Sequence, residues 1–214
     1  MAQRRRAARG LIALAAVAAA GCAALPSPPP SIAPGATAAA PAAPLPTWTL
    51  DPTHTFVHWE IVHMGTSTIR GRFAKPATGS VQFDAAAQRL EASIAVDTAS
   101  VSSGVPVLDV LLKSNAALLD TATYPQATFI ARDARFEGEI PRDLRGTLNL
   151  RGIDQPLTLR ATRWRCALSL VLRRTVCGGD FEGEIARSAF GITHSLLFVA
   201  DRVKLLVQVE AIAP

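Results

Sequence analysis

From Trp48 onward, apolar and polar residues alternate along short stretches of the chain. In residues 56–63, Val57, Trp59 and Ile61 share one parity, whereas His58 and Glu60 share the other. Successive side chains of a strand point to opposite faces, so this alternation predicts strands with one apolar face. The same pattern recurs at Leu90/Ala92/Ile94/Val96, Leu148/Leu150, Leu157/Leu159, Phe181/Ile185 and Val203/Leu205/Val207/Val209/Ala211.

Turn-forming residues separate these runs, for example Lys75-Pro76 and Gly178-Gly179-Asp180. Roughly eight short strands at this spacing predict an all-β domain, either an antiparallel barrel or a sandwich. One stretch departs from period two, because the apolar residues between Val105 and Leu119 lie nearer helical spacing. It predicts a short helix over about Pro106 to Lys113, which would close one end of a barrel.

The N-terminal 21 residues have the three zones of an export signal. Arg4, Arg5, Arg6 and Arg9 form a basic start, and the apolar stretch 11–20 is followed by small residues. Ten residues in a helix rise only about 15 Å, roughly half the thickness of a bilayer core. The stretch therefore predicts a cleaved signal rather than a membrane span.

The signal ends at Ala19-Ala20-Gly21-Cys22, which resembles a bacterial lipoprotein signal in which the cysteine is lipidated. The alternatives are an ordinary secretory signal cleaved near Ala20 and twin-arginine export. Residues 22–46 are rich in Ala and Pro and predict a semi-rigid tether ahead of a folded domain at 47–214. We expect a lipid-anchored protein of the cell envelope or periplasm. The absence of Asp after Cys22 favours the outer membrane where a cell has two.

Cysteine usage and charge agree with export. If Cys22 is acylated, Cys166 and Cys177 remain as a pair in an oxidising compartment, which predicts a disulfide; free thiols and metal ligands are the rival interpretations.

The net charge is +5, with 22 basic and 17 acidic residues. Four of the arginines lie in the signal, so the rest of the chain is nearly neutral. We therefore expect no nucleic-acid partner.

Several motifs resemble the YceI-like family in order and spacing. They cover about residues 48–212. The quoted segments are Asp51-Pro52-Thr53-His54-Thr55, His63-Met64-Gly65, Gly71-Arg72-Phe73, Phe83-Asp84, Leu108-Asp109, Leu112-Lys113-Ser114, Leu119-Asp120, Tyr124 to Phe129, Gly146-Thr147-Leu148, Arg151-Gly152-Ile153, Pro156 to Leu159, Cys177 to Asp180 and Arg187-Ser188-Ala189-Phe190-Gly191. The resemblance implies an extended eight-stranded antiparallel lipocalin-like barrel with one short helix. It also implies an apolar tunnel that in some members binds a long isoprenoid chain.

The resemblance assigns a tunnel wall and also shows departures. The expected ligand-binding residues are Val57, Trp59, Ile61, His63, Phe73, Phe83, Leu112, Leu118, Leu119, Phe129 and Phe190. Leu108 stands where the family usually has Arg, and Leu118 and Leu119 stand where two Phe are usual. The first departure removes a cationic contact, and the second changes the width expected of the tunnel.

No pattern indicates catalysis or a metal site. His54 and His58 share strand parity while His63 faces the opposite side, so three histidines on one strand do not converge. Nucleophile elbows, phosphate-binding glycine loops and His-Glu-x-x-His are missing from the sequence. Glu182 and Glu184 predict a solvated strand face. We expect a binding protein without catalytic residues, metal or cofactor.

The expected ligand is an isoprenoid, a quinone or a polyprenyl lipid, and the expected partner is a membrane reached through the lipid anchor. The alternative function is an envelope stress or interaction module with a filled barrel and no ligand. The sequence leaves the oligomeric state open, with a dimer as one option.

Overall fold

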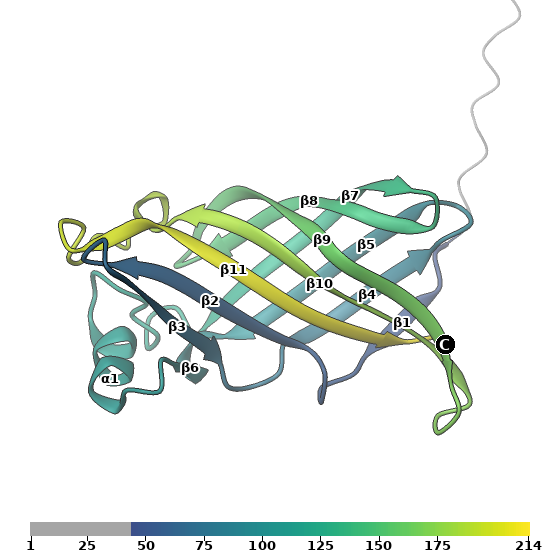
Figure 1. The fold of residues 1–214 in the computed structure, drawn as a ribbon, viewed down its shortest axis with the longest axis horizontal. Helices are drawn as coiled ribbons and strands as arrows, with labels where there is room; N and C mark the ends of the chain where they lie inside the picture. The colour runs from purple at the N-terminus through teal and green to yellow at the C-terminus, as the bar shows by residue number, and fades with distance from the viewer. Residues whose placement is uncertain (1–43) are drawn as a thin grey trace, which may run out of the picture. The chain divides into compact units, whose positions relative to one another are not determined.

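An antiparallel sheet wraps round and closes on itself in residues 44–214, the part of the chain that the computed structural model describes (Figure 1). Eight strands form the closed barrel in the order β1-β4-β5-β7-β8-β9-β10-β11, and β11 pairs back with β1. The predicted eight-stranded antiparallel barrel is thus confirmed. The barrel strands are β1 (Thr47–Leu50), β4 (Thr78–Asp84), β5 (Arg89–Asp97), β7 (Gln126–Glu137), β8 (Ile140–Leu150), β9 (Ile153–Ser169), β10 (Arg174–Ala186) and β11 (Val199–Ile212).

Three further strands extend the wall at one end: β2 (Phe56–His63), β3 (Ser67–Phe73) and β6 (Val101–Ser102). β1 and β2 share the edge of β11, since β1 pairs with Ala211 and Ile212 and β2 pairs with residues 199–208. Thr55 joins the two strands: the residue is 1% exposed, and its hydroxyl donates to the Glu210 carbonyl at 3.3 Å. The long strand β11 therefore pairs with β1 at one end of the molecule and with β2 toward the other.

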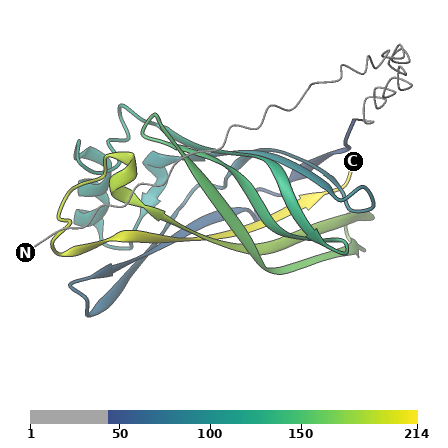
Figure 2. The same ribbon diagram turned by 90° about the horizontal axis from the view of Figure 1, so that it is seen from above.

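The short helix α1 (Pro106–Ser114) confirms the helix expected over Pro106 to Lys113. The Asp109 carboxylate anchors its first turn, accepting from the Ser103 backbone N–H at 2.6 Å and from the Ser102 hydroxyl at 3.0 Å. These hydrogen bonds, led by those from Ser103, lower the pKa of Asp109. Two 3-10 turns, η1 (Thr98–Ser100) and η2 (Arg187–Phe190), complete the described elements. α1 and η2 lie at the same end of the barrel in both views (Figure 2).

Aromatic side chains fill the other end. Phe83 is 4% exposed, and its ring centroid lies 5.6 Å from Trp48 and 5.4 Å from Trp164. Phe136 stacks on the same ring at 6.4 Å, and Trp164 meets Phe181 at 6.0 Å. The Trp48 indole N–H donates to the Phe83 carbonyl at 2.9 Å. Ring contacts of this kind, mostly edge-to-face, pack an interior densely. We call the part of the barrel that holds these five rings the aromatic half; its residues are Trp48, Phe83, Phe136, Trp164 and Phe181.

The disulfide and the start of β1 lie at the same end of the barrel. Cys166 on β9 and Cys177 on β10 are opposite one another and form the expected bridge. The predicted signal (1–21), the predicted lipidation site Cys22 and residues 22–43 of the predicted tether lie outside the described residues. Within residues 44–214, no helix is long and apolar enough to cross a bilayer.

Candidate ligand-binding cavity

A cavity of about 420 Å³ occupies the barrel between the aromatic half and α1. Its wall is apolar and mostly aliphatic, with Trp59, Phe73 and Phe129 as its aromatic members. The strands supply it through alternate residues, because Ile61 lies opposite Val203, Trp59 opposite Leu205 and Val57 opposite Val207. Residues directly opposite across an antiparallel pair share one face of the sheet. The parity observed in the sequence therefore builds a continuous apolar wall, which we call the aliphatic half.

Helix α1 and the loop after it cover one side of this cavity. Leu108, Leu111 and Leu112 line it from the helix, and Leu118 and Leu119 line it from the loop. The loop is tied back to the helix, because the Leu119 N–H donates to the Leu112 carbonyl at 3.1 Å.

Arg151 fixes that loop to the barrel rim. Its guanidinium donates to the Ala116 carbonyl and to the Gly191 carbonyl, both at 2.7 Å, and lies 5.4 Å from the Tyr124 ring centroid. Arg151 and Gly152 have φ values of 55° and 71° and make the two-residue turn between β8 and β9. Such a turn needs two positive φ values, which glycine adopts at no steric cost.

The polar lining residues gather at the α1 end: His63, Arg187, His194 and Ser195. Arg187 is buried and donates to four backbone carbonyls, those of Ala200, Ile192, His194 and Val199, at 2.8–3.1 Å. Burial lowers the pKa of Arg187, but a guanidinium group remains a cation in proteins. Arg187 therefore holds the segment 192–200 in place while adding positive charge to the polar end.

The structure places the predicted ligand-binding residues in two groups. Nine of them line the cavity: Val57, Trp59, Ile61, His63, Phe73, Leu112, Leu118, Leu119 and Phe129. The two others lie away from the cavity wall. Phe83 belongs to the aromatic half, where neighbouring rings occupy the space around it. Phe190 lies in η2 and is 1% exposed within the core rather than on the cavity wall.

Sequence reasoning also missed part of the wall. Ile94, Leu148, Leu157 and Leu205 had the correct parity, but parity alone does not say at which height along the barrel a side chain lies. His194 and Ser195 lie in the turn before β11, where no periodicity exists to find them. Leu108, the departure from the family pattern, lines the cavity with an aliphatic side chain in place of a cation.

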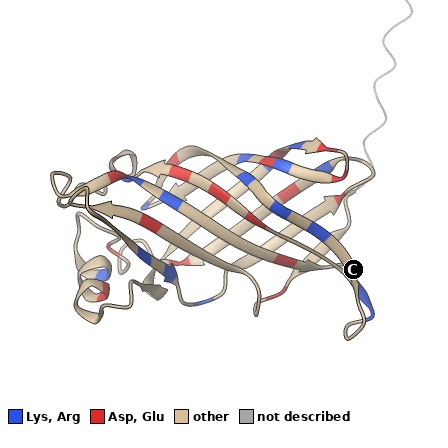
Figure 3. Cartoon of the chain, viewed as in Figure 1, with Lys and Arg blue, Asp and Glu red and all other residues tan. Residues whose placement is uncertain are grey.

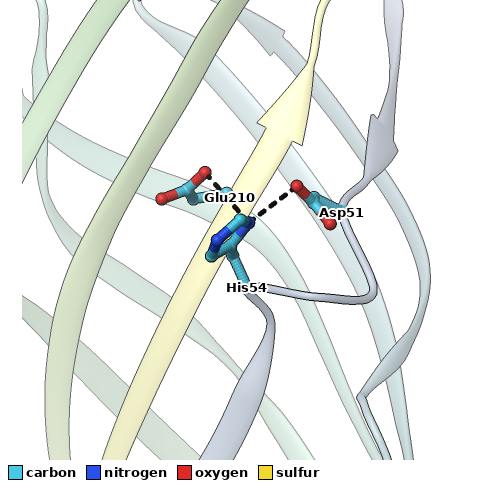
Figure 4. Close-up of side chains that lie close together, drawn as sticks. All are labelled: Asp51, His54 and Glu210. Carbon is cyan, nitrogen blue, oxygen red and sulfur yellow. Dashed lines mark hydrogen bonds and ion pairs between the residues drawn. The ribbon is translucent and has the colours of Figure 1, made fainter.

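The turn between β1 and β2 holds a small ionic cluster away from the cavity (Figure 4). The His54 Nδ1 atom lies 2.8 Å from the Asp51 carboxylate and 3.7 Å from that of Glu210. Hydrogen bonds from Thr53 and His54 lower the pKa of Asp51 to about 2, and the Asp51 hydrogen bond raises the pKa of His54. The three groups are near enough for a metal ion, yet His54 is half exposed and already hydrogen-bonded. The cluster fastens the turn to β11.

The carboxylates of Glu182 and Glu184 lie on the outer face of the barrel. Glu182 pairs with Lys204 at 2.9 Å and Glu184 pairs with Arg202, all four on neighbouring strands β10 and β11 (Figure 3). Both carboxylates are substantially exposed. They therefore form the solvated strand face that the sequence predicts.

The fold and the cavity together define a class, the lipocalin-like antiparallel barrels with an apolar interior. Comparison with known proteins identifies the family, because the YceI-like domain matches residues 48–211. This chain belongs to the YceI-like family. Protein YceI of Salmonella arizonae is 31% identical over 160 residues, which cover 74% of this chain and 82% of that protein.

Two further relatives are informative. A UPF0312 protein of Pseudomonas putida (strain W619) is 36% identical over 110 residues, 51% of this chain and 56% of that protein, so the match spans little more than half of that relative. A solved polyisoprenoid binding domain from Saccharophagus degradans, implicated in plant cell wall breakdown, superposes with a TM-score of 0.55. It is 18% identical, and the superposition covers 79% of this chain and 99% of that domain. The likeness shows a shared fold.

Proposed function

We propose that this protein is an exported, lipid-anchored binding protein that sequesters or carries a long apolar molecule in its barrel. The observation that carries the proposal is the cavity of about 420 Å³, whose wall is apolar and mostly aliphatic. That volume falls within the usual range of small-molecule sites, about 300–1,000 Å³. An interior that served only stability would be filled, as the aromatic half is, since voids destabilise a core.

The chemistry of the wall selects the ligand class. Burial of apolar surface stabilises by about 25 cal/mol per Å², so a few hundred Å² of hydrocarbon would suffice for micromolar binding after entropy losses. The branched aliphatic wall suits an isoprenoid, a quinone tail or a polyprenyl lipid. His63, His194 and Ser195 gather at the α1 end and would meet a polar head there. The description of the Saccharophagus degradans neighbour as a polyisoprenoid binding domain supports this class.

The proposals of export and of lipid anchoring rest on the sequence. A basic, apolar and small-residue start followed by Cys22 is typical of a lipoprotein, and the disulfide suits an oxidising compartment. A carrier of membrane lipids has to reach a bilayer to load, which an anchor on a 22–46 tether would allow. We propose the cell envelope as its location, and binding rather than catalysis as its activity.

Lipid extraction of the protein purified from its native membranes tests the function. We expect mass spectrometry to find a prenyl-type lipid in a near-equimolar amount. Val203→Trp would fill the cavity and should reduce the retained lipid at least tenfold. Gln208→Trp, on the outer face of the same strand β11, is the matched control and should retain it. A parent protein that stays empty after challenge with polyprenyl lipids would favour the alternative, an interaction or stress module.

A further inference from the structure

The hairpin between β9 and β10 projects past the end of the barrel wall. The partner strand β11 ends at Ile212, opposite Val176, whereas the hairpin continues through Arg174 and Ser169 to the turn 170–173 (Figure 1). The Arg173 N–H closes the turn on the Ser169 carbonyl at 2.8 Å. Cys166–Cys177 crosslinks the base of the projecting part. The tip is therefore a braced protrusion with both faces open.

Apolar side chains occupy this tip. Leu170 is 85% exposed and Val171 is 92% exposed, and Leu168 and Leu172 are exposed as well. Four large aliphatic residues in one five-residue stretch are costly to leave in water, because contiguous exposed apolar surface marks an interaction site on most soluble domains. The tip is remote from the cavity, none of whose lining residues lies in 160–184.

Arg173 and Arg174 flank the tip, and Arg165 lies just below the disulfide, opposite Gly178. Residues 164–179 contain Arg165, Arg173 and Arg174 and no Asp or Glu. None of the three arginines forms an ion pair within the described residues, and Arg174 donates only to the Ala213 carbonyl at 3.3 Å. Elsewhere on the barrel, Arg70, Arg135, Arg145 and Arg202 each pair with a carboxylate. Figure 3 marks basic residues along this hairpin.

We propose that the β9–β10 hairpin docks on an anionic lipid bilayer, with Leu170, Val171 and Leu172 inserted among the acyl chains and the arginines at the phosphates. An apolar tip with a basic collar fits such a surface, because aliphatic side chains partition below the headgroups while guanidinium groups bind phosphate. The disulfide keeps the hairpin ordered, which lowers the entropy lost on docking. The hairpin also lies at the barrel end where residues 44–46 enter β1, so a tether to the same membrane would favour this orientation.

Fluorescence of a labelled tip tests the proposal in the full-length chain. With Cys22→Ser in every variant, no acyl group forms and the disulfide leaves Val171→Cys as the single free thiol. An environment-sensitive dye at this position should shift to the blue with vesicles containing 30% phosphatidylglycerol. The matched control is Leu197→Cys, which is 93% exposed at the opposite end of the barrel and should not shift.

Vesicle sedimentation measures how much the apolar and the basic side chains each contribute to membrane affinity. Leu170→Ser/Val171→Ser should weaken binding at least tenfold, whereas Leu196→Ser/Leu197→Ser should leave it unchanged. Arg173→Gln/Arg174→Gln should weaken binding to anionic vesicles by roughly 25-fold, since each charge near such a surface contributes about fivefold, with little change on neutral vesicles. The substituted residues are exposed, so the melting temperature should be retained.

Three results would overturn the proposal. The first is a dye at position 171 that does not respond to anionic vesicles. The second is binding that survives the serine substitutions at the tip. The third is a blue shift that grows with protein concentration in the absence of lipid, which would assign the tip to a second copy of this chain.

Discussion

The two halves of the barrel differ in how side chains fill their interiors. In the aromatic half, the Phe83 ring packs against three other rings, those of Trp48, Phe136 and Trp164. In the aliphatic half, side chains of similar polarity line about 420 Å³ of open volume. The strands that run through both halves have the same alternation. The large side chains of Trp59, Phe73 and Phe129 face the open volume, whereas the rings of the aromatic half pack against one another. The difference between the two halves is therefore mutual ring packing, which the inward parity of a strand does not decide.

Removing a ring from each half gives the largest expected contrast. Phe83→Ala should lower the free energy of unfolding by about 3–5 kcal/mol, because the packed neighbours cannot collapse into the space. Phe73→Ala, on the cavity wall and half-buried, should cost only about 1–2 kcal/mol. Urea unfolding of both variants measures the difference. Equal costs would show that the two halves are packed alike.

The disulfide belongs to the aromatic end, so its loss should affect stability and spare the chamber. Cys166→Ser/Cys177→Ser should cost about 2–3 kcal/mol, the chain-entropy value for a short loop. Lipid retention should stay at the parent level, because neither cysteine lines the cavity. Urea unfolding and lipid extraction test the two statements separately. A loss of lipid at full stability would link the hairpin to the chamber and contradict this separation.

Leu119→Phe restores the aromatic residue usual in the family at a position on the cavity wall. It tests whether the volume of the aliphatic half sets the length of the bound chain. The added ring enters existing space, so stability should change by less than about 1 kcal/mol. The chamber should become smaller and retain shorter chains, which mass spectrometry of bound lipid would show. Leu196→Phe, outside the cavity, is the control. An unchanged chain-length distribution would mean that Leu119 does not limit the ligand.

The smallest effect concerns the turn that joins β1 to β2. The pKa of Asp51 is about 2 against a usual 3.8, so its carboxylate stabilises the fold above pH 3.8 and this contribution is lost as the pH falls through 2. The pKa of His54 is raised above 6.5, so its contribution is complete below pH 6.5 and is lost as the pH rises through the raised value.

Asp51→Asn should therefore lower the melting temperature by about 1–3 °C between pH 4 and 6.5 and by less at pH 9, since exposed ion pairs are weak. Asp84→Asn, a turn carboxylate without a histidine, is the control. Differential scanning calorimetry across this pH range measures both variants. A pH-independent loss at position 51 would assign it to turn geometry alone.

The sequence predicts the wall of the barrel well, because strand alternation alone decides which side chains face inward. Val57, Trp59 and Ile61 follow that parity and line the cavity. It does not predict height along the barrel axis, which depends on register between strands far apart in the chain. Phe83 has the inward parity but lies in the aromatic half. Arg187 and His194 were not predicted in the polar end, because a 3-10 turn and a loop carry no period.

Methyl NMR of the full chain titrated with a polyprenyl alcohol tests the central claim most directly. Ile94, Leu112 and Val203 report on the aliphatic half. Val81 lies opposite Trp48, and Val209 lies opposite Gly179, which is itself opposite Trp164, so these two valines report on the aromatic half. Our account predicts saturable shifts at the first three and little change at the other two. Shifts spread evenly over both sets, or no saturable shift at Ile94, Leu112 and Val203, would contradict a barrel with one solid half and one binding chamber.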